Sequence, residues 1–505
     1  MISRRSLLRT ALATSAVTAG VTPQWNARSR SRERWLRLRR RLDGDLILPG
    51  DTAYPTARQL DNGYFDTVEP SAIAYCATVA DVRAVLRFAQ DEDVATAVRS
   101  GGHSAAGYST TTGVVLDVSR LDRIEVGPST VSLGPGTQGV DLVAALAPYG
   151  AAAVTGNCPT VCAGGYLQGG GIGPLARKYG VASDRVVAAQ VVLADGRVER
   201  VSAHHEPELF WALWGGGGGN FGVVTRFEIR PAAVDRMVTY SLVWPWSRAA
   251  QVIAAFQPWL RRAPHDLAGN LNLVVQNAFP GAVPSVSVSG GWFGGGPESL
   301  IPYLDALIAA VGTAPVRNQV DDLTYSQAMM RYFGCADRTV DQCHRAGTTP
   351  EALLPRHSYV VNRGRLLDGP LPPAAVDALL AAFESAPTAG QLRVVSWAGL
   401  GGRINEVDPA ATAYVHRSAQ FYVAVTAGLP TFTPSSVEET ASRSWADGCF
   451  AVIAPHGAEG QVNFIDPALP DWRTAYYGAN YSRLARIKRR YDPHGFFRFP
   501  QAVGS

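Results

Sequence analysis

Between residues 71 and 235, short apolar runs alternate with segments of helical periodicity. Thr78 and Asp81 fit a capping box, and the apolar positions that follow them at helical spacing predict a helix. Strands are predicted at Ala72–Cys76, Val94–Val98, Val114–Asp117, Ile124–Val126, Thr130–Leu133, Val186–Leu193, Arg197–Val201 and Val223–Ile229, and further helices at Val140–Leu146 and Pro207–Trp214. This alternation is typical of an α/β region.

From about Val238 the pattern changes to longer strands separated by helices. Strands are predicted at Val238–Trp244, Leu271–Gln276, Val286–Gly290, Leu392–Trp397 and Phe421–Val425, with helices at Leu300–Val311 and Ala374–Phe383. We expect an α+β domain with a largely antiparallel sheet. In the aromatic and basic tail, Leu484, Ile487 and Tyr491 form one apolar helical face that ends before Pro493.

The composition is that of a folded protein with more than one domain. The chain has 505 residues, of which 47% are apolar and 17% charged, so general disorder is excluded. No apolar run reaches the ~18 residues of an ordinary membrane span. The net charge of +4 does not indicate nucleic-acid binding, because residues 1–42 carry eleven Arg and one Glu and the remainder carries a net −6.

The N-terminus has the features of an export signal. A charged start is followed by a short, weakly apolar stretch from Thr10 to Val21, and the Arg4-Arg5 pair resembles a twin-arginine signal. An amphipathic or disordered tail is the alternative. The Arg-rich segment 28–41 is expected to be a solvated helix or a linker. Because export permits disulfides, Cys335 and Cys343 could close a short loop, whereas none of the six cysteines has zinc-binding spacing.

Three glycine-rich loops lie within the α/β region, at 100–104, 164–173 and 215–219. Glycine lets backbone N–H groups approach a pyrophosphate closely, so three such loops favour a large phosphate-bearing cofactor over simple turns. Residues 171–176 match a GxGxxA dinucleotide fingerprint, but no clear strand precedes them and Pro174 interrupts the expected helix start. We therefore reject a Rossmann site.

His103 and Cys158 are the candidate reactive residues of these loops. Alone, His103 is most often a solvated or capping residue, and Cys158 a small buried side chain. The two could also form a thiol nucleophile and its base. Sequence spacing does not separate these interpretations.

Taken together, these segments resemble the FAD-linked oxidases of the berberine bridge enzyme type, within the vanillyl-alcohol oxidase superfamily. The resemblance covers about residues 45–505. It is carried by Arg99–Ser104 (RSGGHS), Gly156–Val161 (GNCPTV), Gly169–Gly173, Arg177–Gly180 (RKYG), Gly215–Thr225, Tyr476–Leu484, Tyr491–Pro493 and Phe497-Arg498.

The resemblance implies FAD attached at two points, with His103 bonded to the flavin 8α-methyl and Cys158 to flavin C6. It places Val161 beside the oxygen-reactive flavin carbon, and a small residue there is typical of oxidases. The positions expected to contact FAD are His103, Cys158, Arg99, Ser100, Gly101, Gly102, Ser104, Val161, Gly165, Gly169, Gly170, Gly173, Val223 and Asn480. No metal site is expected.

The same resemblance implies a PCMH-type, two-part FAD-binding domain and an α+β substrate domain. The expected divisions are a signal at 1–27, a basic linker at 28–67, the FAD-binding domain at 68–235, the substrate domain at 236–455, and a C-terminal berberine-bridge-type segment at 456–505 that returns to the FAD domain.

Several positions depart from the family pattern. Cys162 stands where the family usually has Gly, and Tyr166 where it has His. Phe464 stands where the usual general base is Tyr, and a further active-site polar position aligns with Val425. The loss of polar groups suggests an apolar substrate, another base or lost oxidase activity. Replacement acids or bases could be Tyr108, Tyr166, Tyr422 or Tyr477.

We therefore expect an exported flavoprotein oxidoreductase that takes hydride from an alcohol, sugar or secondary-metabolite carbon and reduces O2 to H2O2. The alternatives are a flavin-binding protein with little or no turnover, and a dehydrogenase that uses another acceptor. The expected partners are a small molecule, either apolar or a carbohydrate, together with O2 and the twin-arginine export machinery. The expected location is outside the cytoplasm or in the envelope of a bacterium, with neither nucleic acid nor a membrane span involved.

Overall fold

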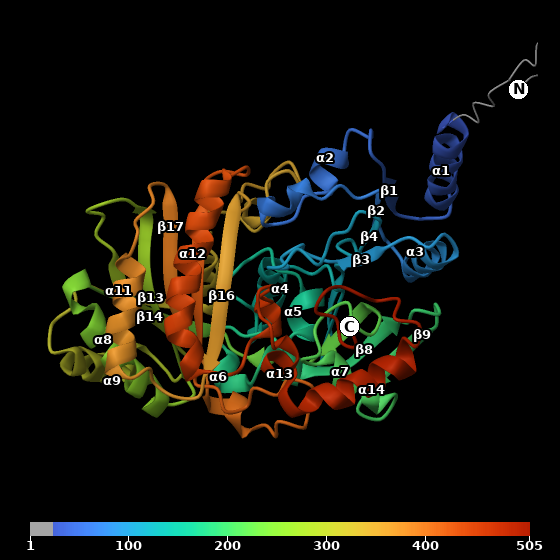
Figure 1. Cartoon of the computed structure of the whole chain (residues 1–505). Coiled ribbons are helices and arrows are strands. Elements are labelled where there is room, and N and C mark those ends of the chain that lie inside the picture. The colour runs from blue at the N-terminus through green and yellow to red at the C-terminus, as the bar shows by residue number, and fades with distance from the viewer. Residues whose placement is uncertain (1–23) are drawn as a thin grey trace, which may run out of the picture.

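The computed structural model describes residues 24–505 and begins with a four-stranded sheet (Figure 1). The strand order is β1 (Asp45–Ile47), β2 (Ala72–Tyr75), β4 (Val114–Asp117), β3 (Thr96–Arg99), with β2, β4 and β3 parallel. Helix α3 (Val79–Asp91) connects β2 to β3 and buries Val82, Val85 and Leu86 against this sheet. Its predicted capping box is confirmed, because Thr78 accepts from the Asp81 N–H and Asp81 accepts from the Thr78 N–H.

Helix α1 (Gln24–Arg39) packs against α3 along one apolar side. Trp35 and Leu38 are buried, and the Trp35 ring centroid lies 4.8 Å from that of Phe88. Arg34 also donates to Glu92 at 3.3 Å. The helix expected at 28–41 is present, but it is not fully solvated, because Trp35 and Leu38 are buried among the arginines.

A second, five-stranded antiparallel sheet follows in the order β5 (Ile124–Val126), β6 (Val131–Leu133), β10 (Val223–Ile229), β8 (Val186–Val192), β9 (Val198–Ser202). All five strands were predicted. A small sheet pairs β7 (Ala151–Ala152) with β11 (Ala232–Ala233). Helices α4 (Gly139–Leu146), α6 (Ala176–Tyr179) and α7 (Pro207–Leu213) complete this region. The glycine-rich stretch 156–173 contains one helix that its composition did not predict, α5 (Ala163–Gln168).

The third sheet has seven antiparallel strands and is covered on one face by helices, at the left of Figure 1. Its order is β15 (Arg317–Thr324), β12 (Arg236–Trp244), β14 (Ser285–Trp292), β13 (Leu267–Ala278), β17 (Gln391–Gly399), β18 (Phe421–Leu429), β16 (Tyr359–Leu367). Helices α8 (Ala249–Arg262), α9 (Pro297–Val311), α11 (Pro373–Glu384) and α12 (Ser436–Ile453) bury its apolar face. The predicted α+β fold with a largely antiparallel sheet is thus confirmed.

Side chains alternate between the two faces of these strands. Leu271, Val288 and Val423 point into the core beneath the helices. The opposite face, which we call the open face, carries half-buried neutral polar side chains in neighbouring register. They are Asn270, Asn272, Ser287, Ser289 and Ser396. The edge strands β15 and β16 were not predicted, because Asp and Arg residues interrupt their apolar pattern.

Buried cations connect the first two sheets to the seven-stranded region. The Arg177 guanidinium, on α6, donates to the carbonyls of Leu267 at 2.8 Å, Leu260 at 3.1 Å and Ala263 at 3.1 Å, and to that of Leu400. Arg417 donates to both carboxylate oxygens of Asp184 at 2.7 and 2.8 Å. These contacts fix the angle between the two regions.

The C-terminal segment returns to the first region, where α14 (Tyr481–Tyr491) packs beside α7 (Figure 1) and α13 (Trp472–Tyr477) contacts α14. The predicted face of Leu484, Ile487 and Tyr491 is buried. Lys488 is buried with it, and its Nζ donates to Asn220 O and Phe497 O at 2.6 Å each and to Asp492 at 2.7 Å. The tail is therefore joined to the end of the glycine-rich loop 215–219.

Cys335 and Cys343 are joined by a disulfide. Among residues 24–505, no group of His, Cys, Asp and Glu side chains is arranged to hold a metal ion, and no helix is long and apolar enough to cross a membrane. The predicted signal at Arg4-Arg5 lies outside the described residues.

We predict that Arg177→Met destabilises the protein by about 3 kcal/mol or more, because four carbonyls lose their buried donor. The neighbouring Lys178→Met is the matched control. Lys178 is partly exposed and pairs with Asp266 at 2.6 Å, so its loss should cost less than about 1 kcal/mol. Urea denaturation followed by tryptophan fluorescence measures both, and equal losses would contradict the assignment.

Candidate cofactor and active site

His103 and Cys158 lie on two different loops that meet at Thr160. His103 lies on the loop after β3, and Cys158 on the loop before α5. Thr160 Oγ1 lies 2.9 Å from His103 Nε2 and 3.6 Å from Cys158 Sγ. One hydroxyl thus contacts both predicted attachment residues, and the imidazole and the thiol reach the same small region.

Burial changes the proton affinity of both groups. It lowers the pKa of His103, with the Asp61 charge acting in the opposite direction, so the imidazole is neutral and nucleophilic at neutral pH. Burial also raises the pKa of the Cys158 thiol, although hydrogen bonds with Thr160 oppose this. The thiol must therefore lose its proton during any reaction that uses its sulfur.

Two residues beside His103 were missed by the sequence analysis. Asp61 Oδ2 lies 3.6 Å from His103 Nδ1 and 2.8 Å from His357 Nδ1. Burial opposes ionisation of Asp61, but the hydrogen bond with His357 and the positive groups around the carboxylate outweigh it and lower the carboxyl pKa. Asp61 and His357 are 296 residues apart in the chain and belong to no motif, so only the fold brings them together.

Contacts at both ends and along its length hold the loop that carries His103. Arg99 forms a buried ion pair with Asp117 on β4 and donates to Ala57 O at 2.8 Å. At the other end of the loop, Ser104 Oγ accepts from the Tyr108 N–H at 3.1 Å. Ser100 packs against Gly164, and Gly101 against Thr160 and Cys162. Gly102, with φ of +72°, makes the left-handed turn before His103. The structure thus places Arg99 in the support of the loop.

Cys162 lies in this support, where its sulfur packs against Gly101. Its thiol is buried and donates to Gly136 O at 3.2 Å. Burial raises the pKa of this thiol strongly. These contacts fit a small packed side chain.

Gly165 opens onto empty space. It is exposed, and nothing among the described residues lies within 4 Å of the point where a Cβ would stand. Asn463 of the C-terminal segment holds the backbone here by donating to Gly165 O and Tyr166 O at 3.2 Å each. A helical backbone held beside open space can accept a ligand in close contact.

The other glycines predicted to contact the cofactor pack against the protein itself. A Cβ at Gly169 would meet Asn463, one at Gly170 would meet Tyr414, and one at Gly173 would lie 1.8 Å from Thr155 O. Val223 is buried in the second sheet. Asn480 donates to Pro409 O at 2.9 Å and so holds the loop before β18.

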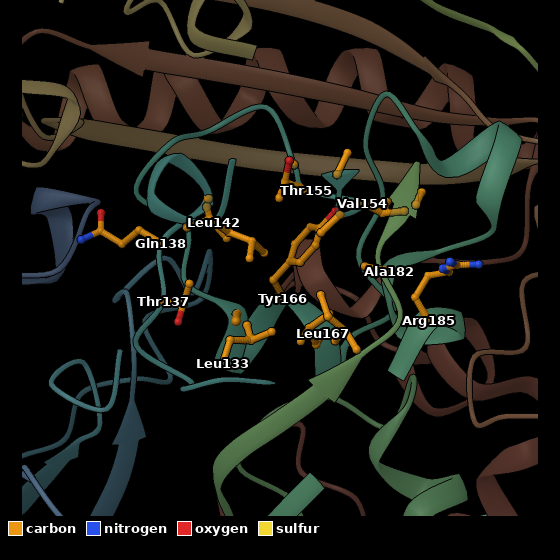
Figure 2. A pocket seen from close by; sticks show the side chains of 18 of the residues that line it. Leu133, Thr137, Gln138, Leu142, Val154, Thr155, Tyr166, Leu167, Ala182 and Arg185 are labelled. Carbon is orange, nitrogen blue, oxygen red and sulfur yellow. The ribbon is translucent and has the colours of Figure 1, made fainter. Parts of the chain in front are cut away.

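A mostly aliphatic cavity lies behind Cys158 and Val161. Figure 2 shows the Tyr166 ring between Leu142 and Ala182 in this cavity, with Arg185 at its edge. The Tyr166 hydroxyl donates to Ile172 O at 3.0 Å. Tyr166 therefore acts as a wall of the cavity, and its raised pKa, caused by burial, argues against a role as a base.

The other tyrosine candidates differ in the freedom of their hydroxyl groups. Tyr477 donates to Gly216 O at 3.1 Å, and Tyr108 packs 5.3 Å from the Phe499 ring. The Tyr422 hydroxyl has no hydrogen-bond partner among the described residues. Burial raises the pKa of all three phenols. None is therefore poised as a phenolate.

Phe464 and Tyr422 form a stacked pair, with ring centroids 4.8 Å apart and planes inclined by 16°. Phe464 is 42% exposed, so it is accessible from solvent.

Val425 was expected at a polar active-site position, and this was wrong. Alternate residues of a strand point to opposite faces of the sheet, so Val425 points away from the face that carries Tyr422 and Ala424. Its side chain lies in the core under α12.

One acid and imidazole pair was not anticipated. The Nδ1 atom of buried His416 lies 2.7 Å from Glu459 Oε2. The Glu459 carbonyl also accepts from the Leu366 N–H of β16. The two residues are 43 positions apart, so no spacing pattern linked them.

Two family profiles match the chain. Residues 70–202 match the family described as FAD binding domain, and residues 462–504 match the one described as Berberine and berberine like. The first includes His103 and Cys158, and the second includes Asn463 and Phe464.

Full-length relatives are similar at 26–29% identity. An uncharacterized FAD-linked oxidoreductase of Bacillus subtilis is 29% identical over 471 residues, which are 92% of this chain and 98% of that protein. The (R)-6-hydroxynicotine oxidase of Paenarthrobacter nicotinovorans is 29% identical, covering 90% and 96%. The chitooligosaccharide oxidase of Gibberella zeae is 28% identical, covering 86% and 87%.

Solved structures share the fold. The BBE-like 1 protein of Physcomitrella patens superposes with a TM-score of 0.82 at 24% identity, covering 93% of this chain and 98% of that one. The xylooligosaccharide oxidase of Myceliophthora thermophila superposes with a TM-score of 0.79 at 23% identity, covering 94% of this chain and 98% of that one.

We predict that Gly165→Val folds normally but loses flavin. The new side chain would occupy space that is open in the protein, so it clashes only with a bound ligand. The helix propensities of Gly and Val differ by less than about 1 kcal/mol, so the free energy of unfolding should change little. Gly448→Val is the matched control. It also lies in a helix with nothing within 4 Å of its Cβ position, but in the seven-stranded region. Bound flavin is measured from absorbance and the fold from circular dichroism. Wild-type flavin content in Gly165→Val would show that the space serves another purpose.

Proposed function

Because the chain belongs to the berberine bridge enzyme-like FAD-linked oxidases, we propose that it holds FAD through both His103 and Cys158 and oxidises a hydroxylated small molecule, with O2 as acceptor. The observation that carries this proposal is the meeting of the two side chains at Thr160, 2.9 Å from the imidazole and 3.6 Å from the thiol. Two nucleophiles that contact the same hydroxyl suit two positions on one edge of a flat ring system.

The residues present fit the cofactor. FAD, when bound, supplies a two-electron acceptor for a substrate hydride. The neutral His103 and the Cys158 thiol offer the electron-rich atoms for attachment, and the exposed backbone at Gly165 leaves room for a ring to lie against it. Attachment at two points would orient the ring and prevent its loss.

The cavity beside Val161 supports O2 as the acceptor. O2 is small and apolar, and the cavity is lined mainly by aliphatic groups such as Leu142, Val154 and Leu167. The small Val161 side chain leaves this space close to Cys158. This protein would therefore conduct O2 through a cavity whose lining is mainly apolar.

The open face of the seven-stranded sheet supports a substrate that carries hydroxyl groups. Its Asn and Ser side chains are neutral and half-buried, and Ser396 pairs with Ala424, on the same face as Tyr422. The flat Tyr422 and Phe464 rings offer an apolar surface beside them. Hydrogen-bonding groups beside an aromatic surface suit a sugar ring better than the purely apolar substrate suggested by Phe464 alone.

The test is an oxygen-consumption and H2O2 screen of purified protein against oligosaccharides, aromatic alcohols and hydroxylated N-heterocycles. Oxygen uptake matched by H2O2 with an oligosaccharide supports the proposal. Flavin reduction without oxygen uptake would indicate a dehydrogenase, and no reduction by any class would favour a flavin-binding protein. Phe464 supports this last alternative, because its side chain cannot accept the substrate proton.

We predict that Phe464→Tyr raises the rate of flavin reduction by about tenfold or more, because a general base typically contributes 10²–10⁴-fold. The wild-type phenols have raised pKa values and are poor bases. Stopped-flow absorbance with one substrate measures the reduction step. Tyr422→Phe is the matched control, since it removes the stacked partner's hydroxyl. A fast wild type that gains nothing from Phe464→Tyr would exclude an impaired base.

We also propose export by the twin-arginine route, on the basis of Arg4-Arg5. Replacing both with Lys keeps the charge and removes the pair that the receptor recognises. Flavin-containing protein should then accumulate in the cytoplasm, as measured by cell fractionation. Unchanged export would count against this route.

A further inference from the structure

The cavity behind Cys158 and Val161 exists because small side chains line much of it. They include Gly139, Ala152, Ala153, Ala163, Ala182 and Ala232. Protein interiors are otherwise closely packed, so these positions leave space that larger side chains would fill. The empty space amounts to about 570 Å³, counting the part that is open to solvent, and this lies within the roughly 300–1,000 Å³ of small-molecule sites. The cavity is therefore extensive enough for a thin organic ligand as well as for O2.

Two arginines border this cavity. Arg185 ends the short helix η3 (Ala182–Arg185) and lies at the edge of the cavity in Figure 2, and Arg230 lies in the turn between β10 and β11. Arg185 donates through Nε to Arg230 O at 3.0 Å and through Nη2 to Pro231 O at 2.8 Å. In return, the Arg230 N–H donates to Arg185 O at 2.7 Å. These bonds hold both residues at the edge of the cavity.

The positive charge at this edge has no counter-ion in the protein. Arg185 is half-buried and donates only to carbonyl groups, and among residues 24–505 neither arginine forms an ion pair. Burial and the charge of Arg230 both lower the pKa of Arg185, although the guanidinium stays charged at neutral pH. Two neighbouring guanidinium groups without a carboxylate partner favour an anionic ligand, because a carboxylate can accept charge-assisted hydrogen bonds from them.

The interior of the cavity favours a chain over a ring. The Tyr166 ring lies between Leu142 and Ala182 in Figure 2, and its hydroxyl is held by Ile172 O at 3.0 Å. This ring already occupies much of the width, so a second flat ring would require it to move. An unbranched alkyl chain is thinner and can follow the aliphatic wall that includes Val154 and Leu167.

We propose that the cavity binds an unbranched aliphatic monocarboxylate, with the carboxylate on Arg185 and the chain directed toward Val161. The unpaired charge recognises one end of the ligand, and burial of the chain among aliphatic groups stabilises the other. The ligand would occupy the space through which O2 is proposed to reach the flavin, and would therefore slow the oxidation of reduced flavin. This regulatory consequence rests on the proposed function, whereas the binding site does not.

Titration calorimetry of the full-length flavin-containing protein with octanoate tests the binding site. Octanoate should bind about tenfold or more tightly than octanol, since only the carboxylate makes charge-assisted bonds to Arg185. From hexanoate to octanoate, each added CH2 should tighten binding about fourfold. Octylamine and benzoate should bind more weakly than octanoate, because one has the wrong charge and the other the wrong shape. Equal affinities for octanoate, octanol and octylamine would overturn the proposal, as would the absence of octanoate binding.

Three variants locate the ligand. Arg185→Gln should weaken octanoate binding about tenfold or more and leave octanol binding unchanged. Val154→Phe fills the space and should weaken both ligands. The matched control is Arg200→Gln, because Arg200 lies on the same sheet but pairs with Glu228 at 3.1 Å and does not line the cavity. It should keep the wild-type affinity.

Circular dichroism reports whether each variant folds. If Arg185→Gln does not fold, Arg230→Gln replaces it, because the exposed Arg230 side chain makes none of the bonds that hold the edge. Wild-type octanoate affinity in Val154→Phe and in the arginine variant that folds would overturn the proposed site.

Oxidation of the flavin tests the regulatory consequence. The flavin is photoreduced without substrate and mixed with O2 in a stopped-flow instrument. Octanoate at about ten times its Kd fills about nine-tenths of the sites and should slow oxidation about tenfold. Val154→Phe should slow it without octanoate, and Arg200→Gln should not. Octanoate binding with no change in rate would overturn the regulatory role. Failure of the ligand-free reduced protein to react with O2 would instead contradict O2 as the acceptor in the proposed function, while calorimetry decides the binding site.

Discussion

One hydroxyl, Thr160 Oγ1, contacts both the His103 imidazole and the Cys158 thiol, and the rest of the site depends on that contact. The two side chains come from loops attached to different sheets, so their separation is fixed by the packing of those sheets against each other. The Arg99 and Asp117 ion pair holds one loop, and backbone bonds from α4 hold the other. Together these supports hold two weak nucleophiles at a distance that suits one flat ring.

The sequence predicted the strands and helices with strong periodicity, including the capping box at Thr78. It failed where tertiary packing overrides composition. Helix α5 forms among glycines although their helix propensity is low. The side chain of Asn463, nearly three hundred residues away, supports it by donating to Gly165 O and accepting from the Gly171 N–H just beyond its end. The attachment residues were found because they lie in motifs, whereas Asp61 and His357 carry no local signal. Val425 was misplaced because a shift of one residue along a strand reverses the face that a side chain occupies.

The two surfaces around the proposed flavin position differ in chemistry. Behind Val161 the packing is aliphatic, which suits O2, and the open face of the large sheet is lined by neutral Asn and Ser. Arg177 and the Arg417 and Asp184 pair fix the angle at which these surfaces meet. A hydride donor and an apolar acceptor would therefore approach from different directions. Burial raises the pKa of Tyr422, which stacks on Phe464, so this phenol is a poor base.

Tryptic mass spectrometry of the purified, acid-denatured wild type tests the central claim most directly. The account predicts that peptide 100–120 and peptide 124–177 are recovered joined through one flavin, with His103 and Cys158 as the linked residues. Recovery of both peptides at their unmodified masses, with all flavin released into the acid supernatant, would contradict it.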